Sequence, residues 1–431
     1  MKLTIHRGTH QIGGTCVELN SASGRLFLDM GMPLAVPGDT PFDPTEGVST
    51  QELIRRGVLP PVQDLYAEGE RGGVCGLVVS HAHTDHVGLA GYLSKGIPVF
   101  ATEGARALLD ASRIFLPRSV DPSRWRLLPK SEPIQIGPFT VTASLVDHSA
   151  PDAVMLLAEA EGKKVLYSGD LRAHGRKAAL FERLIAHPPK DVDCLLLEGT
   201  MIGRGQQEYP NERAVEEALV EVLWRKTNLA LIFCSSQNLD RLVSIYRAVK
   251  RTNTTLVIDL YTAFTLKALR CISKSIPQFD WPNVRVKYWK HHADCLASTG
   301  QTDFLYEVRR SKIEIEEIVE CRAGITMLAK ANRLLPVVLK NLPSTEGLEF
   351  LWSMWRGYLT GDDIVSQIAA ELGVQLKTIH TSGHATVTDL RRLAEALTPR
   401  WIVPIHTMDP DRYLGLFNNV RIVGDGEELS L

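Results

Sequence analysis

The sequence predicts an α/β fold in which one domain is inserted into another. The chain opens with short strands joined by tight turns, from Leu3 to Asp29. From about residue 203, helices alternate with apolar strands, which is typical of a doubly wound α/β unit. Residues 375–431 then return to strands that end in a polar residue. We therefore expect one domain made of residues 1–202 and 375–431, and an inserted domain of residues 203–374.

Composition limits the classes of protein that need to be considered. A chain of 431 residues can bury two sizeable cores. The net charge of −2 gives no overall attraction to nucleic acid, so a polyanion would have to be held by local charge or by metal. The seven cysteines contain no CxxC pair, which argues against a disulfide framework and a thiolate zinc site. No apolar run approaches membrane-spanning length, so we expect a cytoplasmic protein without a membrane partner.

The stretch Ser80–Gly88 has the residue density of a metal site. It holds His81, His83, Asp85 and His86 directly after the apolar run Gly76–Val79, and a helix is predicted to follow. Imidazole ligates zinc and other transition metals, and four donors this close cannot all reach one ion without strain. Two metal ions are therefore predicted. A histidine-rich surface loop is the alternative, but it would not explain the buried strand before the motif.

Several other predicted strands also end in an acid or a histidine. These residues are Asp29, His148, Asp170, Glu198, His380 with His384, and His406. Each one alone could be a hydrogen-bonded structural residue, and Asp29 could equally cap a turn. Strands that end alike, however, suggest one rim on which ligands converge.

The motif His81-Ala82-His83-Thr84-Asp85-His86 resembles the HxHxDH signature of the metallo-β-lactamase fold. Asp29, His148 and Asp170 occupy the places of that fold's strand-end aspartate, its later single histidine and its metal-bridging aspartate. The resemblance implies an αββα sandwich.

The inserted α/β part, followed by Ser382-Gly383-His384 and Ile405-His406, resembles the β-CASP branch of this fold, the nucleases that include ribonuclease J. The resemblance covers essentially the whole chain and implies an inserted α/β β-CASP domain. In that branch a histidine at the last motif accompanies RNA-directed members, so His406 favours RNA. Two departures stand out: Thr407-Met408 replace the Gly-Glu of many RNA-cleaving relatives, and the extra C-terminal domain of ribonuclease J is expected to be absent.

The resemblance implies a role for each residue. One zinc ion would be held by His81, His83, His148 and Asp170, and the other by Asp85, His86, Asp170 and His406, with Mn²⁺ as an alternative ion. Asp29 would orient a ligating histidine. Glu198 and His384 would form an acid pair, in which the carboxylate orients the imidazole that protonates the leaving oxygen. Asp85, Glu198 and His384 are thus the expected catalytic residues.

Substrate is expected at two loops, one in the inserted part and one in the segment that returns to the first domain. His380, Ser382 and Gly383 lie in the loop that resembles the phosphate-holding loop of ribonuclease J. Ser235 and Ser236 follow a strand and precede a helix whose amides could meet a phosphate. Arg241 is interpreted as a solvated helix residue, residues 285–290 as a half-exposed strand, Phe304–Glu320 as a charged helix, and the pair Trp352 and Trp355 as part of the core.

The expected function is a zinc-dependent ribonuclease that hydrolyses RNA, single-stranded by preference, as a 5′-exonuclease, an endonuclease or both. A DNA-directed nuclease or another dizinc hydrolase of the same fold is the first alternative. A catalytically silent nucleic-acid-binding partner is the second, although every expected metal position is filled. The expectation is also compatible with a homodimer.

Overall fold

A computed structural model of the chain describes residues 1–34, 47–66, 72–115, 119–205 and 207–431, apart from the side chain of Gln63. The chain divides into two compact units, residues 1–205 with 383–431 and residues 206–382. The second unit is thus an insertion in the first. Its limits lie three and eight residues beyond the expected ones, at 205 against 202 and at 382 against 374.

The first unit contains two sheets. The first has the strand order β20-β1-β2-β3-β4-β5-β6. Its strands are β1 (Lys2–Arg7), β2 (Cys16–Ser21), β3 (Gly24–Leu28), β4 (Val74–Val78), β5 (Val99–Ala101), β6 (Trp125–Leu127) and β20 (Glu428–Ser430). The strands β20, β1, β2 and β3 pair antiparallel, whereas β3 to β6 pair parallel. The short strands expected from Leu3 to Asp29 are β1, β2 and β3.

The second sheet has the order β19-β11-β10-β9-β8-β7. Its strands are β7 (Pro133–Ile136), β8 (Phe139–Leu145), β9 (Val154–Ala160), β10 (Lys163–Tyr167), β11 (Cys194–Glu198) and β19 (Trp401–Ile405). β19 comes from the segment that follows the insertion, and it pairs parallel with β11. The end of the chain therefore completes a sheet that the first 200 residues begin.

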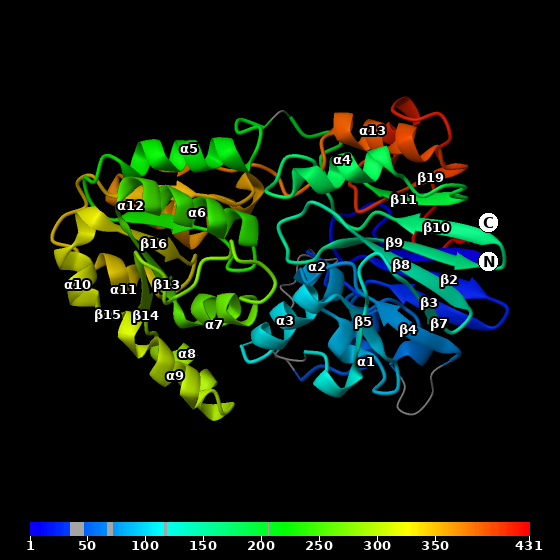
Figure 1. Cartoon of the computed structure of the whole chain (residues 1–431), viewed down its shortest axis with the longest axis horizontal. Coiled ribbons are helices and arrows are strands. Elements are labelled where there is room, and N and C mark those ends of the chain that lie inside the picture. Colours follow the sequence, from blue (N-terminus) through cyan, green and yellow to red (C-terminus); the bar gives the residue numbers. More distant parts are fainter. Residues whose placement is uncertain (35–46, 67–71, 116–118, 206) are drawn as a thin grey trace. The chain divides into compact units, whose positions relative to one another are not determined.

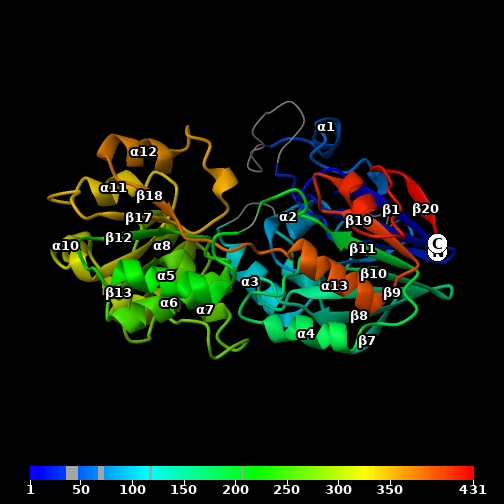
Figure 2. The same cartoon turned by 90° about the horizontal axis from the view of Figure 1, so that it is seen from above.

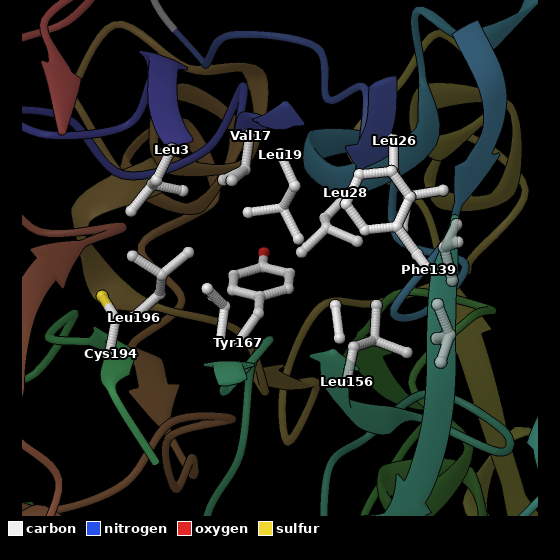
Figure 3. Packing of buried hydrophobic residues seen from close by; sticks show 14 of the residues in the cluster. Leu3, Val17, Leu19, Leu26, Leu28, Phe139, Leu156, Tyr167, Cys194 and Leu196 are labelled. Atoms are coloured by element: carbon white, nitrogen blue, oxygen red, sulfur yellow. The ribbon is translucent and has the colours of Figure 1, made fainter. Parts of the chain in front are cut away.

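The two sheets face each other across one hydrophobic core (Figure 3). Leu19 and Leu28 of the first sheet meet Leu156 of the second there, and alternate residues of each strand point inward. Tyr167 is fully buried in the same core, with its hydroxyl among these leucines (Figure 3). A phenol in this position needs a hydrogen-bond partner.

Helices complete the layers of the first unit. They are α1 (Thr50–Arg55), α2 (Thr84–Val87), α3 (Glu103–Ser112), α4 (Ala178–Ala186) and α13 (Val387–Leu397), with 3-10 turns at Gln63–Leu65, Ala90–Tyr92, Pro122–Arg124 and Pro410–Gly415. α4 and α13 pack Phe181 and Leu393 against Leu195 on the outer face of the second sheet. In Figure 1, α1 and α3 lie beside β4 and β5 of the first sheet. The unit is therefore a sandwich of helix, sheet, sheet and helix layers.

The second unit is built on one all-parallel sheet with the order β15-β14-β13-β16-β12-β17-β18. Its strands are β12 (Ala230–Phe233), β13 (Thr255–Asp259), β14 (Val284–Lys287), β15 (Lys312–Ile313), β16 (Ile325–Ala329), β17 (Glu349–Trp352) and β18 (Leu376–Thr378). β18 pairs with β17 and so belongs to this sheet, although we expected residues 375–431 to lie in the first domain.

Helices cover both faces of this sheet. They are α5 (Glu212–Leu223), α6 (Leu239–Thr252), α7 (Leu260–Ala268), α8 (Lys290–Ser298), α9 (Thr302–Val308), α10 (Ile315–Glu320), α11 (Leu335–Leu339) and α12 (Ile364–Leu372), with 3-10 turns at Arg309–Ser311, Arg322–Gly324 and Arg356–Tyr358. In Figure 2, α11 and α12 lie on one side of the strands and α5 and α6 on the other.

The single helix expected over Phe304–Glu320 is wrong. The chain leaves the helix after Val308 and forms β15, which pairs with β14 and buries Ile313. A second helix, α10, begins only at Ile315, where Glu314 and Glu317 form a capping box. Edge pairing and burial of a β-branched side chain therefore override the helical charge pattern.

Within the described parts of the chain, no helix is long and apolar enough to cross a membrane.

Candidate metal centre

Six strands of the first unit deliver polar side chains at their carboxyl ends. β3 leads to Asp29, β4 to His81, β8 to His148, β10 to Asp170 and β19 to His406, while β11 ends in Glu198 itself. Asp29 and His406 both have left-handed backbone angles, with φ of 58° and 52°. Such angles are uncommon for residues other than glycine and concentrate where a side chain must be aimed at a site.

His81, His83 and His148 form one group of potential metal donors. His83 Nδ1 lies 3.2 Å from His81 Nε2 and 3.1 Å from His148 Nε2. His148 Nδ1 donates to the carbonyl oxygen of Gly383 at 2.8 Å, which leaves Nε2 to face the other two rings. A carbonyl partner of this kind fixes the tautomer and the orientation of a ligating histidine.

Asp85, His86, Asp170 and His406 form a second group. His86 Nε2 lies 3.3 Å from an Asp170 carboxylate oxygen, and His406 Nε2 lies 3.4 Å from Asp85 Oδ2. His86, Asp170 and His406 are almost completely buried. Imidazole and carboxylate are both zinc ligands, so this donor set suits the metal that was expected from the motif.

Asp170 lies within reach of both groups. Its Oδ2 is 3.7 Å from His81 Nε2 and 3.9 Å from His148 Nε2, in addition to its contact with His86. Its Oδ1 is buried and accepts no hydrogen bond from any described residue. A buried carboxylate oxygen without a donor is costly unless a cation balances it. The residues therefore fit a pair of metal ions that share Asp170.

The pKa of His86 is shifted in the opposite direction to the pKa values of His81 and His148. Burial, together with neighbouring imidazoles, holds the pKa of His81 and of His148 well below the ordinary value, which favours the neutral ring that binds metal. Burial also lowers the pKa of His86, but the carboxylates of Asp170 and Asp85 outweigh it and raise that pKa well above the ordinary value. This second group therefore attracts positive charge, which a metal ion would supply.

Asp29 binds His86 through Nδ1, the ring nitrogen that does not face Asp170. Asp29 Oδ2 accepts hydrogen bonds from His86 Nδ1 at 2.7 Å, from the Tyr167 hydroxyl at 2.8 Å and from the Ser80 hydroxyl at 2.6 Å. Its Oδ1 accepts the Ser80 amide at 2.7 Å. The carboxylate thus fixes the proton of His86 on Nδ1 and leaves Nε2 for the centre.

Asp85 is positioned by a close approach of two backbones. The amides of Gly14 and Thr15 donate to the Asp85 carbonyl oxygen at 3.0 and 3.3 Å. A Cβ on Gly31 would lie 1.7 Å from the same oxygen. Only glycine fits at position 31, because any side chain would push the Asp85 backbone away.

Glu198 and His384 lie beside the second group. His384 Nδ1 is 3.5 Å from Glu198 Oε1 and 3.7 Å from Asp170 Oδ2. Glu198 is fully buried and is held by the amides of Thr200 at 2.9 Å and Ala385 at 3.2 Å. Burial lowers the pKa of His384, but the carboxylates of Asp170 and Glu198 outweigh it and raise that pKa above the ordinary value.

The expected substrate-binding residues of the second unit lie after its parallel strands. Ser235 is exposed, whereas Ser236 is buried and bonded to the Thr262 hydroxyl at 2.6 Å. His380 and Ser382 follow β18, and Gly383 begins the returning segment of the first unit. The two serines therefore differ in what they can contact, since only Ser235 presents its side chain to solvent.

Arg241 is not the solvated residue that the sequence suggested. It is fully buried, and its guanidinium binds the Glu212 carboxylate through two hydrogen bonds of 3.0 and 3.1 Å. It also donates to His380 Nδ1 at 3.2 Å and to the Thr381 carbonyl oxygen at 3.2 Å. Arg241 therefore fixes the loop that carries His380 and Ser382.

Of the two tryptophans expected in the core, only Trp352 lies there. Trp352 is buried, as expected, but Trp355 is 42% exposed and stacks edge-on against Tyr358. The strand expected over residues 285–290 is confirmed only in part, because β14 ends at Lys287 and α8 begins at Lys290. Lys287 is buried and pairs with Glu314 at 3.0 Å.

Three residues that support the site are not among those predicted from the sequence. Tyr167 donates its hydroxyl proton to Asp29. Thr200 shares a hydrogen bond of 2.9 Å with His406 Nδ1, and Gln207 accepts the Ser382 amide. Tyr167 and Thr200 each lie within three residues of a predicted site residue, and this proximity was the available signal.

The fold and the donor set define the class as a metallo-β-lactamase-type domain whose histidine and aspartate groups could hold metal. Residues 42–220 match the family model described as the beta-lactamase superfamily domain. The whole chain also superposes on the crystal structure of a protein of unknown function from Enterococcus faecalis V583, with a TM-score of 0.77, 20% identity and coverage of 100% of this chain and 99% of that one. The predicted α/β metallo-β-lactamase fold is thus confirmed.

Curated relatives narrow this class. The chain is 22% identical over 378 residues to ribonuclease J of Sinorhizobium meliloti, covering 81% of this chain and 60% of that protein. It is 20% identical to ribonuclease J of Helicobacter pylori strain B128, covering 94% and 56%, and 22% identical to that of Mycobacterium tuberculosis, covering 94% and 68%. Over most of its length the chain is thus similar to ribonuclease J, the resemblance that the motifs indicated. It spans less than two thirds of the length of the first two relatives.

Proposed function

We propose that this chain is a metal-dependent ribonuclease that hydrolyses phosphodiester bonds of single-stranded RNA. The observation that carries the proposal is the position of Asp170, whose carboxylate lies within 4 Å of imidazoles from both donor groups. Two divalent ions bound there, zinc or alternatively manganese, would supply a water nucleophile at neutral pH and stabilise charge on the phosphoryl oxygens.

Each of the two ions would be bound by its own group of residues. His81, His83 and His148 would hold one ion and Asp85, His86 and His406 the other, with Asp170 shared. Asp29 keeps the His86 proton on Nδ1 through its bond of 2.7 Å, so the other ring nitrogen stays available. The Gly383 carbonyl does the same for His148.

Glu198 and His384 are proposed as the pair that handles the leaving group. The Glu198 carboxylate is immobilised by two backbone amides and faces His384 Nδ1 at 3.5 Å. With Nδ1 turned to the carboxylate, Nε2 is the ring nitrogen that would donate a proton to the departing oxygen. His384 is also partly exposed, with 19% of its side chain accessible, so a substrate oxygen can reach it.

RNA is proposed as substrate because the similar curated proteins are named ribonuclease J and because His406 occupies the last motif. The proposed action is 5′-exonucleolytic, endonucleolytic or both. A DNA substrate, a small ester and a homodimer stay predictions that the following assay and a mass measurement address.

The test is incubation of the metal-loaded protein with RNAs labelled at either end and bearing a 5′ triphosphate, monophosphate or hydroxyl. A ladder from the 5′ end that requires the monophosphate indicates exonuclease action, and internal products from every form indicate endonuclease action. DNA of the same sequence and a generic phosphodiester are run in parallel. Cleavage of DNA alone, or of the small ester alone, would contradict the proposal.

Asp170→Ala and His83→Ala should each lower RNA cleavage by about a hundredfold or more, since even outer partners of metal ligands contribute about 10–100-fold. His291→Ala is the matched control, because His291 is an exposed histidine on α8 of the second unit. Folded Asp170→Ala protein that cuts RNA as fast as the parent would overturn the assignment.

A further inference from the structure

The inserted sheet has a switch in its strand order. β12, β13, β14 and β15 run outward in one direction, and β12, β17 and β18 run outward in the other. β16 fills the place between β12 and β13. In parallel α/β sheets, ligands bind in the crevice beyond the carboxyl ends of the strands at such a switch.

Lys330 is the first residue after β16 and therefore lies at this switch. Its ammonium donates to the Cys234 carbonyl oxygen at 3.1 Å and to the Ser236 hydroxyl. Both acceptors belong to the turn that follows β12. One cation is thus held directly against the turn that carries Ser235 and Ser236.

The Lys330 ammonium uses two of its three N–H groups for these hydrogen bonds. In the described part of the chain it forms no ion pair with a carboxylate. Other cations near this edge are balanced: Lys287 pairs with Glu314 at 3.0 Å and Arg241 with Glu212 at 3.0 Å. A partly exposed ammonium held in place without a carboxylate favours an anionic ligand.

The neighbouring serines complete the arrangement. The Ser236 hydroxyl already makes two hydrogen bonds within the protein, since it accepts one from Lys330 and shares one of 2.6 Å with the Thr262 hydroxyl. Ser235 next to it is exposed. A ligand at this turn would therefore meet the Ser235 side chain and the third N–H of Lys330, while Ser236 fixes the ammonium.

We propose that Lys330 binds a phosphate group of the RNA strand at the Ser235 turn of the inserted sheet. The proposal rests on the ribonuclease function proposed above and adds to it a cation that the motif residues do not include. Ser236 acts as a positioning residue, and Ser235 is the neutral donor beside the charge.

The test measures binding rather than cleavage. A 3′-fluorescein single-stranded RNA is titrated with the full-length protein at several salt concentrations, and a gel after each titration verifies that the RNA is intact. Loss of one phosphate contact to a single strand lowers the slope of log affinity against log salt by about 0.7, which corresponds to about fivefold weaker binding at 0.1 M salt. We expect this result for Lys330→Gln, and parental behaviour for Lys330→Arg.

Lys250→Gln is the matched control. Lys250 is exposed near the end of α6, which leads to the amino end of β13 and thus to the opposite edge of the sheet. The charge change is the same, so an unchanged slope in this variant assigns the effect to the position of Lys330. If Lys330→Gln does not fold, Lys330→Met keeps the length of the stem and replaces it.

Parental affinity and slope in folded Lys330→Gln would overturn the proposal while leaving the ribonuclease function standing. An equal loss in Lys250→Gln would overturn it as well. A parent protein that binds no RNA would overturn both proposals together.

Discussion

Asp29→Asn is the most informative single change in the centre, because it removes a charge without changing shape. Asp29 is fully buried and accepts four hydrogen bonds, from the Ser80 amide, the Ser80 hydroxyl, the Tyr167 hydroxyl and His86 Nδ1. Asparagine tolerates the left-handed backbone angle of this position, so the backbone gives no reason for an effect.

The expected loss of stability follows from the number of hydrogen-bond donors that face the Asp29 carboxylate. An amide offers one acceptor oxygen, so its NH₂ must face either the fixed Ser80 amide or the cluster at Oδ2. At least one buried donor then loses its acceptor at about 1–3 kcal/mol, and the charge-assisted bond to His86 is lost as well. We expect about 3 kcal/mol of destabilisation, and about 10–100-fold weaker metal binding because the His86 tautomer is no longer fixed.

The assays are urea unfolding and metal content after dialysis against a dilute chelator. Tyr167→Phe is the control, because it removes one donor, keeps the carboxylate and should cost only about 1 kcal/mol. An Asp29→Asn protein with parental stability and parental metal retention would refute the role given to this carboxylate.

Three further outcomes are expected. Burial alone would raise the pKa of Glu18, but the hydrogen bonds from His6 and Arg25 lower this pKa from 4.5 to about 2. The stabilisation by the Glu18 carboxylate is therefore present above pH 4.5 and is lost as the pH falls toward 2. Glu18→Gln should therefore cost about 2 kcal/mol at pH 7, after allowance for the partial exposure of Arg25, and should flatten the acid limb of the stability profile measured by urea unfolding. Gly31→Ala should lower metal content and the unfolding midpoint, whereas Gly47→Ala, with open space around its Cβ, should change neither. Arg241→Met should lower the free energy of unfolding in urea by about 3–5 kcal/mol, because it leaves the buried Glu212 carboxylate without its cation. The double variant Arg241→Met with Glu212→Leu should lose less stability. An equal loss in both variants would contradict the pairing.

The rim of the first unit could be predicted because its signals are local. Asp29, His81, His148, Asp170, Glu198 and His406 lie at the end of a short apolar strand or within three residues after it. The spacing of His81, His83, Asp85 and His86 specifies a strand-to-helix turn within a few residues. The alternation of buried strands and amphipathic helices likewise located the insertion. These features depend on neighbours in the sequence, which a single chain displays.

Other features depend on partners far along the chain. Arg241 lies on the buried stripe of α6, three and four residues before Ser244 and Ile245. Its charge is balanced there by the carboxylate of Glu212 on α5. β18 joins the inserted sheet because β17 offers it an edge, which its own residues do not reveal. Tyr167 reads as an apolar strand residue until Asp29, 138 positions away, accepts its hydroxyl.

Metal stoichiometry tests the shared centre most directly. The purified parent, loaded with zinc and dialysed, should contain about two ions per chain by elemental analysis, in line with a two-metal site. His83→Ala should retain about one ion and Asp170→Ala fewer than one, because His83 belongs to one donor group whereas Asp170 is within reach of both. A folded Asp170→Ala protein that retains both ions would contradict the account.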